Sequence, residues 1–107
     1  MTVRELTKMA RYVYATLNIN ENVCVKNLDG KPWSTMVYGL HTLRNDGMRV
    51  MWLRFKNRRG KPYTKRFILS ILAHELAHII GCYHTQRFKK AHRQATRLLK
   101  TYIRGKI

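Results

Sequence analysis

The chain has 107 residues, of which 22 are Lys or Arg and 5 are Asp or Glu, so its formal net charge is +17. A chain of this length is expected to form one domain over residues 1–107, with a small core and no second module. Because charges of one sign repel each other, we expect a polyanionic partner, with nucleic acid favoured over an anionic membrane surface. No apolar run is long enough to span a membrane.

The cysteines and the N-terminus favour an intracellular protein. Cys24 and Cys82 form no C-x-x-C pair and cannot provide a disulfide framework, which favours reduced thiols. The N-terminus runs directly into charged residues and shows no signal peptide. We therefore expect a monomer in the cytoplasm or in association with DNA in a nucleoid or nucleus.

The first predicted element is an amphipathic helix from residue 2 to about residue 18. Thr2 and Glu5 have the spacing of a capping box, in which each side chain bonds to the other residue's backbone N–H. We expect this helix to cover one face of a sheet. Its apolar residues recur at helical spacing, at Val3, Leu6, Ala10, Val13 and Leu17.

Three predicted strands follow, at Asn22–Leu28, Trp33–Thr42 and Met48–Lys56. The dipeptides Asp29-Gly30 and Asp46-Gly47 are typical of tight turns, so we expect the strands to form a three-stranded antiparallel meander. In the third strand, apolar residues alternate onto both faces, which predicts that it is covered on both sides.

Two helices complete the predicted order of elements, and the fold class is therefore α+β. A basic loop, Asn57–Pro62, leads to Thr64, the expected N-cap of a helix that is apolar on nearly every side. After His84, Thr85 is the expected N-cap of a C-terminal helix. This last helix carries one apolar stripe, at Phe88, Ala91, Ala95, Leu98 and Tyr102.

The eleven residues from His74 to His84 read H-E-L-A-H-I-I-G-C-Y-H and match the pattern H-E-x-x-H-x-x-G-x-x-H. On a helix, His74 and His78 share one face about 5–6 Å apart, so both can bind one tetrahedral metal ion. Glu75 points beside this pair and can act as a general base without becoming a ligand. Gly81 allows the helix to end, so that His84 can approach from another direction.

These residue types favour a catalytic zinc ion over a structural one. Three protein ligands leave the fourth position open, whereas structural zinc sites are closed by four ligands. A bare H-E-x-x-H also arises by chance, but imidazoles and a carboxylate on a buried helix are costly unless they are paired or coordinated. The expected cofactor is Zn2+, with His74, His78 and His84 as its ligands and Glu75 as the catalytic base.

The motif continues into His84-Thr85-x-x-Phe88, within the order of helix, three strands, metal helix and final helix. This combination resembles the SprT-like and WLM-domain zinc metallopeptidases, with motif support over residues 48–100. The resemblance implies a minimal zincin-like fold. In that family the three histidines bind zinc, the glutamate activates water, and well-known members cleave proteins crosslinked to DNA. No methionine follows His84, which disfavours a metzincin.

Basic residues concentrate on both sides of the motif, and no acidic residue follows Glu75. The alternative interpretation is a solvated basic face, but such a face normally mixes both signs of charge. We expect contacts to nucleic acid, DNA first, that are made mainly to phosphates and are insensitive to base sequence. The loop cluster comprises Arg54, Lys56, Arg58, Arg59, Lys61, Lys65 and Arg66, and the helix cluster comprises Arg87, Lys89, Lys90, Arg93, Arg97, Lys100 and Arg104.

Several residues outside the motif allow two interpretations. His41 and His92 are expected to be surface or sheet histidines and not metal ligands. Trp33 and Trp52 are expected in the core, although either could stack on unpaired bases. Gly39, inside a predicted strand, indicates a bulge or a close approach to the backbone, such as that of a substrate.

The sequence thus predicts a zinc-dependent endopeptidase that acts on protein associated with or crosslinked to nucleic acid. The protein substrate is expected to lie extended along an exposed sheet edge. Two alternatives stay open: a nucleic-acid-binding module with a structural or vestigial zinc site, and a metal-dependent hydrolase with a non-peptide substrate. Metal content alone does not separate these three functions.

Overall fold

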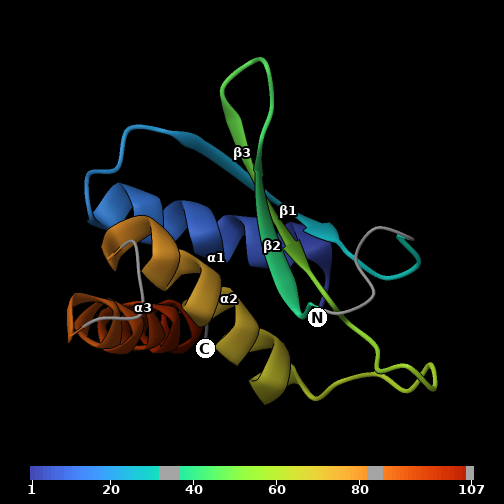
Figure 1. The fold of residues 1–107 in the computed structure, drawn as a ribbon. Coiled ribbons are helices and arrows are strands. Elements are labelled where there is room, and N and C mark those ends of the chain that lie inside the picture. Colours follow the sequence, from blue (N-terminus) through green and yellow to red (C-terminus); the bar gives the residue numbers. More distant parts are fainter. Residues whose placement is uncertain (32–36, 82–85, 106–107) are drawn as a thin grey trace.

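Three helices and three strands follow one another in the order α1, β1, β2, β3, α2, α3 (Figure 1). The structure is a computed structural model that describes residues 1–31, 37–81 and 86–105. The predicted α+β class and the predicted order of elements are confirmed. The helices are α1 (Val3–Thr16), α2 (Lys65–Gly81) and α3 (Gln86–Arg104), and the strands are β1 (Asn22–Asn27), β2 (Gly39–Leu43) and β3 (Met48–Leu53).

Side-chain caps set the starts of two helices, as the sequence predicts. The hydroxyl of Thr2 accepts the backbone N–H of Glu5 at 3.1 Å and caps α1. The hydroxyl of Thr64 accepts the backbone N–H of Phe67 at 3.2 Å, immediately before α2. The predicted cap of the last helix, Thr85, lies outside the described residues.

The sheet is mixed, which corrects the predicted antiparallel meander. Its strand order is β1-β3-β2, with β1 parallel to β3 and β2 antiparallel to β3. The turn at Asp46-Gly47 joins neighbouring strands as predicted, but the chain leaves β1 at Asp29-Gly30 without forming a hairpin. The second strand begins at Gly39, later than predicted, and residues 33–36 of that prediction lie outside the described residues.

Hydrogen bonds just after β1 explain the parallel pairing. The backbone N–H of Leu28 donates to the carbonyl oxygen of Leu53 at 2.9 Å, so the contact with β3 continues past the end of β1. The Asp29 carboxylate then accepts the backbone N–H of Phe55 at 3.2 Å. Because these bonds hold the segment against the end of β3, it does not fold back as a hairpin beside β1.

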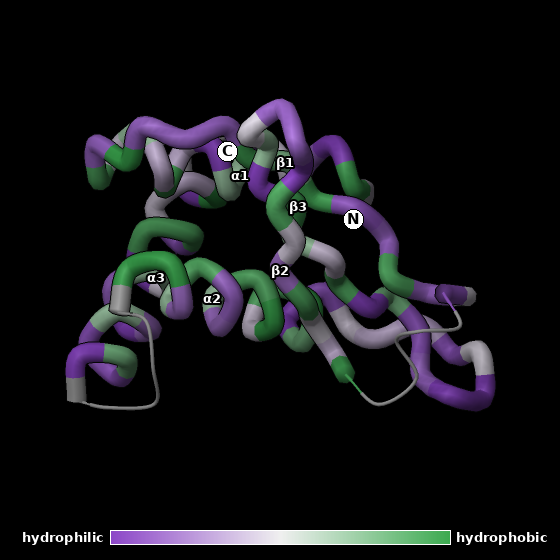
Figure 2. The backbone as a smooth tube through the Cα atoms, turned by 45° about the horizontal axis from the view of Figure 1, so that its top comes forward, coloured by the Kyte–Doolittle hydropathy of each residue, from purple (hydrophilic) through white to green (hydrophobic). Residues whose placement is uncertain are grey.

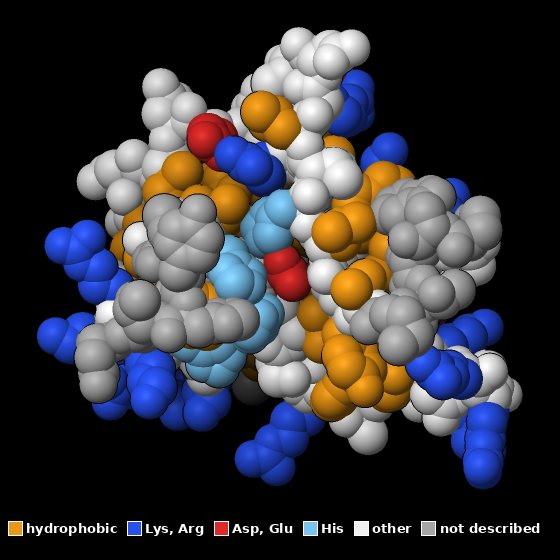
Figure 3. All heavy atoms as spheres, in the orientation of Figure 1, with side chains coloured by type: hydrophobic (Ala, Val, Ile, Leu, Met, Phe, Trp, Pro, Cys, Tyr) orange, Lys and Arg blue, Asp and Glu red, His pale blue; other side chains and the backbone are white. Residues whose placement is uncertain are grey.

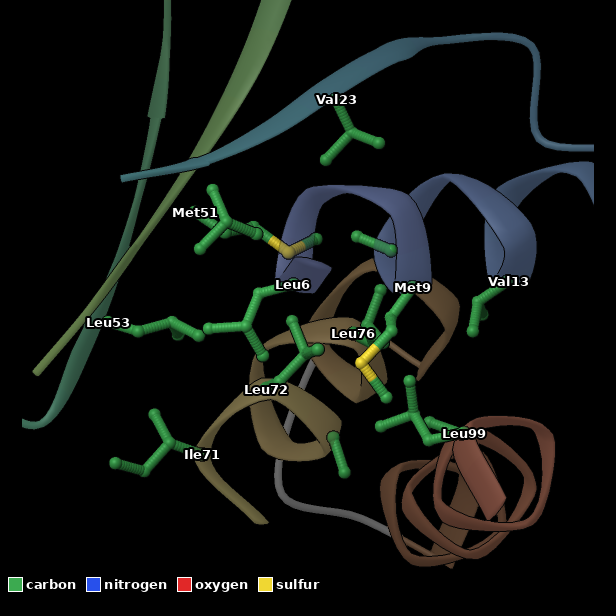
Figure 4. Close-up of a cluster of buried hydrophobic side chains, with 14 of the residues drawn as sticks. Leu6, Met9, Val13, Val23, Met51, Leu53, Ile71, Leu72, Leu76 and Leu99 are labelled. Atoms are coloured by element: carbon green, nitrogen blue, oxygen red, sulfur yellow. The ribbon is translucent and has the colours of Figure 1, made fainter. Parts of the chain in front are cut away.

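The core lies between one face of the sheet and the helices. α1 and α2 pack against the strands, and α3 packs against α2 and α1 (Figure 1). In Figure 4, Met51 and Leu53 of β3 point toward Leu6 of α1 and Leu72 of α2. On the other face of β3, Val50 is buried but Trp52 is only partly buried, so the predicted cover on both sides is met at Val50 and not along the whole strand.

Hydropathy follows this architecture. Figure 2 shows hydrophobic segments in the helices and strands, and hydrophilic segments in the β2–β3 turn and the β3–α2 loop. No helix in the described part of the chain is long and apolar enough to cross a membrane. The apolar stripe of α3 has its most buried members at Phe88, Ala91, Ala95 and Leu99, while Leu98 and Tyr102 are partly buried.

The register between β2 and β3 decides which side chains of β2 face the helices. Gly39 lies opposite Leu53, and His41 lies opposite Met51. Directly opposed residues of an antiparallel pair share a face of the sheet. Because Met51 and Leu53 face the helical layer, Gly39 and His41 face it as well, next to α2.

Candidate active site

The first two histidines of the motif lie together on α2, one helical turn apart. The Nε2 atoms of His74 and His78 are 3.1 Å from each other, and both side chains are partly buried. Two nitrogens that each bind one tetrahedral zinc at about 2.0–2.1 Å lie about 3.3 Å apart. The spacing of this pair therefore fits two ligands of a single zinc ion.

The third predicted ligand, His84, lies outside the described residues. Within residues 1–31, 37–81 and 86–105, no group of three His, Cys, Asp or Glu side chains gathers in metal-binding geometry. The structure thus brings together two of the three predicted ligands and leaves the assignment of His84 as a prediction.

Phe88 of α3 packs against both imidazoles of the pair. Its ring centroid is 5.1 Å from that of His74 and 4.8 Å from that of His78. Phe88 is itself buried, because it joins a small apolar cluster with Ala77 and Ala91. Contact between α2 and α3 therefore restricts the orientation of the two imidazoles, which is a requirement of a preorganised metal site.

Glu75, the predicted catalytic base, is the buried charged residue among those described, with 6% of its surface exposed. Its Oε2 lies 2.7 Å from Nε2 of His41, and its backbone oxygen lies 2.9 Å from the same nitrogen. Both partners are acceptor oxygens when the carboxylate is ionised, so His41 Nε2 carries a proton and donates to Glu75. A carboxylate at this depth needs such a donor to offset its loss of hydration.

Gly39 provides the space that the Glu75 side chain occupies. A Cβ atom built on Gly39 would lie 2.6 Å from Glu75 Oε1 and 3.0 Å from its Cδ. The predicted close approach to the backbone of Gly39 is therefore real, but in this structure it is made by Glu75. Together, Gly39 and His41 make β2 the wall against which the Glu75 carboxylate is fixed.

Glu75 and His74 line an open cleft of about 590 Å³. Figure 3 shows histidine side chains around an acidic side chain in a hollow of the surface, with hydrophobic side chains along one side. The cleft is wide enough for a segment of peptide or a small molecule. The cleft is lined by the polar residues Ser70, His74, Glu75 and His92, by the apolar or aromatic residues Val37, Tyr38, Phe67 and Ile71, and by Gly39.

The sequence did not identify the roles of His41 and His92 at this site. His41 lies on the sheet, as expected, but its side chain contacts Glu75, the predicted catalytic base. His92 of α3 lines the cleft, with its ring centroid 6.3 Å from that of His74. Gly39 and His41 lie on the same face of the predicted strand, and this spacing was the signal in the sequence. It predicts a contact with Glu75 only when the helix that faces this strand is known.

Residues of both basic clusters line hollows that share residues with the cleft. Arg58 and Arg59 of the loop cluster line a hollow of about 310 Å³ that shares Val37 and Tyr38 with the cleft. Four residues of the helix cluster line another hollow, of about 470 Å³, that shares His92 with it. Every residue of both clusters is exposed except Arg54, which is partly buried. The four in the second hollow are Arg93, Arg97, Lys100 and Arg104.

Few of these basic side chains are paired with acids. The ion pairs among the described residues involve Arg44, Arg49, Arg54 and His41, and none involves a residue of α3. The sequence of α3 contains no acidic residue at all. Its positive charge is therefore not neutralised within the described structure, and an external anion would meet it directly.

Comparisons with protein-family models, with curated proteins and with solved structures find no match to this chain. The functional argument therefore rests on the geometry and chemistry of the site itself.

Proposed function

We propose that this chain is a zinc-dependent endopeptidase that cleaves protein held at nucleic acid, similar in its motif to the SprT-like and WLM-domain metallopeptidases. One observation carries the proposal. Two imidazole nitrogens 3.1 Å apart lie on the same helix as a buried carboxylate, and His74 and this carboxylate both line an open cleft. Hydrolysis needs both a metal position and an adjacent base, and this arrangement offers both.

The zinc ion would be held by His74, His78 and His84. When bound there, zinc lowers the pKa of water toward about 7 and polarises a substrate carbonyl group. Glu75 accepts the proton from the attacking water and then donates it to the leaving amine. His41 holds the Glu75 carboxylate in place through the 2.7 Å contact, so that its second oxygen stays oriented for this proton transfer.

The edge of the sheet supports an extended peptide as the substrate. Within the described residues, β2 pairs on one side with β3 and is an edge strand on its other side. Gly39 at the start of β2 lines the cleft next to Glu75. A peptide added along this edge would be held by backbone hydrogen bonds, with little demand on its side chains.

The positive charge of the chain supports a protein substrate that is bound to nucleic acid. A net charge of +17, with exposed basic residues near the cleft and an α3 that contains no acidic residue, favours binding to phosphates through counterion release. Enzyme and DNA-bound protein then share one polymer, which raises their effective concentration. Contacts of this kind carry no information about base sequence.

The proposal is tested by incubating the zinc-loaded protein with a basic DNA-binding protein, with and without single-stranded DNA, and scoring fragments. We expect cleavage that depends on zinc and increases with DNA, and none from a Glu75→Gln variant. Binding to DNA without any cleavage would favour the nucleic-acid-binding module. Zinc-dependent turnover of small esters or amides, without cleavage of any protein, would favour a non-peptide hydrolase.

A further inference from the structure

Three aromatic side chains form a cluster at the outer end of the cleft. The ring centroid of Tyr38 is 6.1 Å from that of Tyr63 and 5.6 Å from that of Phe67, and the last two are 4.4 Å apart. Tyr63 packs against the core, but Tyr38 is 56% exposed and Phe67 is 36% exposed. An aromatic ring exposed to this extent costs hydration free energy unless a partner covers it.

Hydrogen bonds from Arg54 to backbone carbonyl oxygens hold the segment that contains Tyr38 beside the loop cluster. The backbone N–H of Arg54 donates to the carbonyl oxygen of Tyr38 at 2.9 Å, and the side-chain Nε of Arg54 donates to the carbonyl oxygen of Val37 at 2.8 Å. Arg54 also lies 4.0 Å from the Asp29 carboxylate. These contacts hold the backbone of the segment that carries Tyr38 against the β3–α2 loop, and the Tyr38 ring contacts Tyr63 and Phe67.

The same loop presents its arginines to this ring. The side-chain oxygen of Asn57 accepts the backbone N–H groups of Arg59 and Lys61 at 2.9 and 3.0 Å, which closes a tight turn. Arg58 and Arg59 at this turn line the hollow of about 310 Å³ together with Tyr38 and Tyr63. One hollow therefore combines flat aromatic surface with guanidinium groups.

We propose that this hollow binds one unpaired nucleotide of a single-stranded nucleic acid. Its base stacks on Tyr38, and its flanking phosphates contact Arg58 and Arg59. Aromatic rings interleaved with cations are what single-stranded nucleic acid requires, since bases in a duplex already stack on each other. An acidic peptide would use the arginines but would leave the aromatic surface uncovered.

The site rests on the nucleic-acid part of the proposed function and adds to it a place where an unpaired nucleotide binds. Because the hollow shares Val37 and Tyr38 with the cleft, a bound strand would lie next to the cleft that Glu75 lines.

The test compares two fluorescent oligonucleotides of equal length and charge, one of thymidine and one with abasic sugars, by anisotropy at fixed salt. We expect Tyr38→Ala to weaken thymidine binding by about 5- to 150-fold and to leave abasic binding unchanged. Tyr38→Phe should keep the wild-type affinity, because it retains the ring. Leu43→Ala serves as the matched control, since it removes an equally exposed apolar side chain from the far end of β2.

Two results would overturn the site while leaving the proposed function in place. One is equal affinity of the wild type for the thymidine and abasic strands, and the other is unchanged thymidine affinity in Tyr38→Ala. If Tyr38→Ala instead slowed only the cleavage of peptides with large apolar side chains, the cluster would be a peptide subsite. A wild type that binds neither strand would remove nucleic acid from the proposed function itself.

Discussion

At the scale of single residues, the candidate base is held by two elements that are distant in sequence. Glu75 comes from α2, and both His41 and Gly39 come from the edge strand β2. The histidine donates to the carboxylate, and the glycine leaves room for it. This arrangement fixes a buried carboxylate and gives it a hydrogen-bond donor.

Replacing Glu75 by Gln tests its role as a base. Gln keeps the shape of the side chain but cannot accept and return a proton at neutral pH, so we expect hydrolysis to fall by at least about a hundredfold. Zinc content and the thermal unfolding midpoint should stay close to those of the wild type. Cleavage by Glu75→Gln at the wild-type rate would exclude Glu75 as the base.

Gly39→Ala tests the packing of the carboxylate. Its added Cβ would meet Glu75 Oε1 at 2.6 Å, so the carboxylate must move. We expect kcat to fall by up to about a hundredfold, because a displacement of about 1 Å misaligns a catalytic group. The control is Gly105→Ala, whose Cβ would make only ordinary contacts, at 3.6 Å from the carbonyl oxygen of Thr101. Equal kcat values in the two variants would show that Glu75 is not confined by β2.

Tyr14 predicts how stability depends on alkaline pH. Burial, assisted by the nearby charge of Glu21, raises the pKa of Tyr14 from 10.0 to about 12. Between these values the unfolded state loses the phenol proton and the folded state keeps it, so the free energy of unfolding falls as pH rises. The full loss is about 2–3 kcal/mol above pH 12.

Urea unfolding of the wild type and Tyr14→Phe, at pH 7 and pH 11, measures this effect. At pH 7 we expect Tyr14→Phe to be at least as stable as the wild type, because the Tyr14 hydroxyl is buried without a hydrogen-bond partner in the described structure and its removal breaks no hydrogen bond. At pH 11 the wild type should lose more stability than the variant, and the comparison cancels changes common to both, such as lysine deprotonation. A loss of equal size in both proteins would contradict the assignment to Tyr14.

At the scale of elements, helices could be predicted from the sequence and strand pairing could not. A cap such as Thr64 and an apolar stripe are local signals, and they identified where α1 and α2 begin. Parallel pairing of β1 with β3 depends on bonds of Leu28 and Asp29 to residues far along the chain, which no local pattern encodes. The turn chemistry of Asp29-Gly30 therefore predicts a hairpin, whereas the chain there does not return beside β1.

The helix cluster can be tested as an element by charge reversal. Arg93 and Arg97 are exposed, one turn apart on α3. We expect Arg93→Glu with Arg97→Glu to remove the stimulation of cleavage by DNA and to reduce the salt dependence of DNA binding. Cleavage of a short unstructured peptide, at the same ionic strength, should be nearly unchanged.

The matched control is the reversal of Arg4 and Lys8, which are exposed at the same spacing on α1 and change the net charge equally. If both double variants lose DNA binding to the same extent, net charge and not the position of the cluster determines it. Unchanged binding in the α3 variant would identify this face as a solvated surface.

At the scale of the whole molecule, the sequence predicts the site residues within the motif but not the residues of other elements that pack around them. His74, His78 and Glu75 share one helix, so their spacing along the chain fixes their geometry. His41 and Gly39 join the site only because β2 pairs antiparallel with β3 in a particular register. The cleft itself requires the packing of three elements, α2, α3 and β2.

Zinc binding provides a test on the whole molecule. We expect about one zinc ion per chain by native mass spectrometry, and a higher unfolding temperature with zinc than after chelation, because an ion that binds only the folded state stabilises it. His74→Ala, His78→Ala and His84→Ala should each weaken zinc binding sharply. His41→Ala should retain the ion, since its Nε2 is directed to Glu75, and its cleavage rate should fall. Full zinc occupancy in His84→Ala would remove the third ligand, and loss of zinc in His41→Ala would place β2 in the metal site.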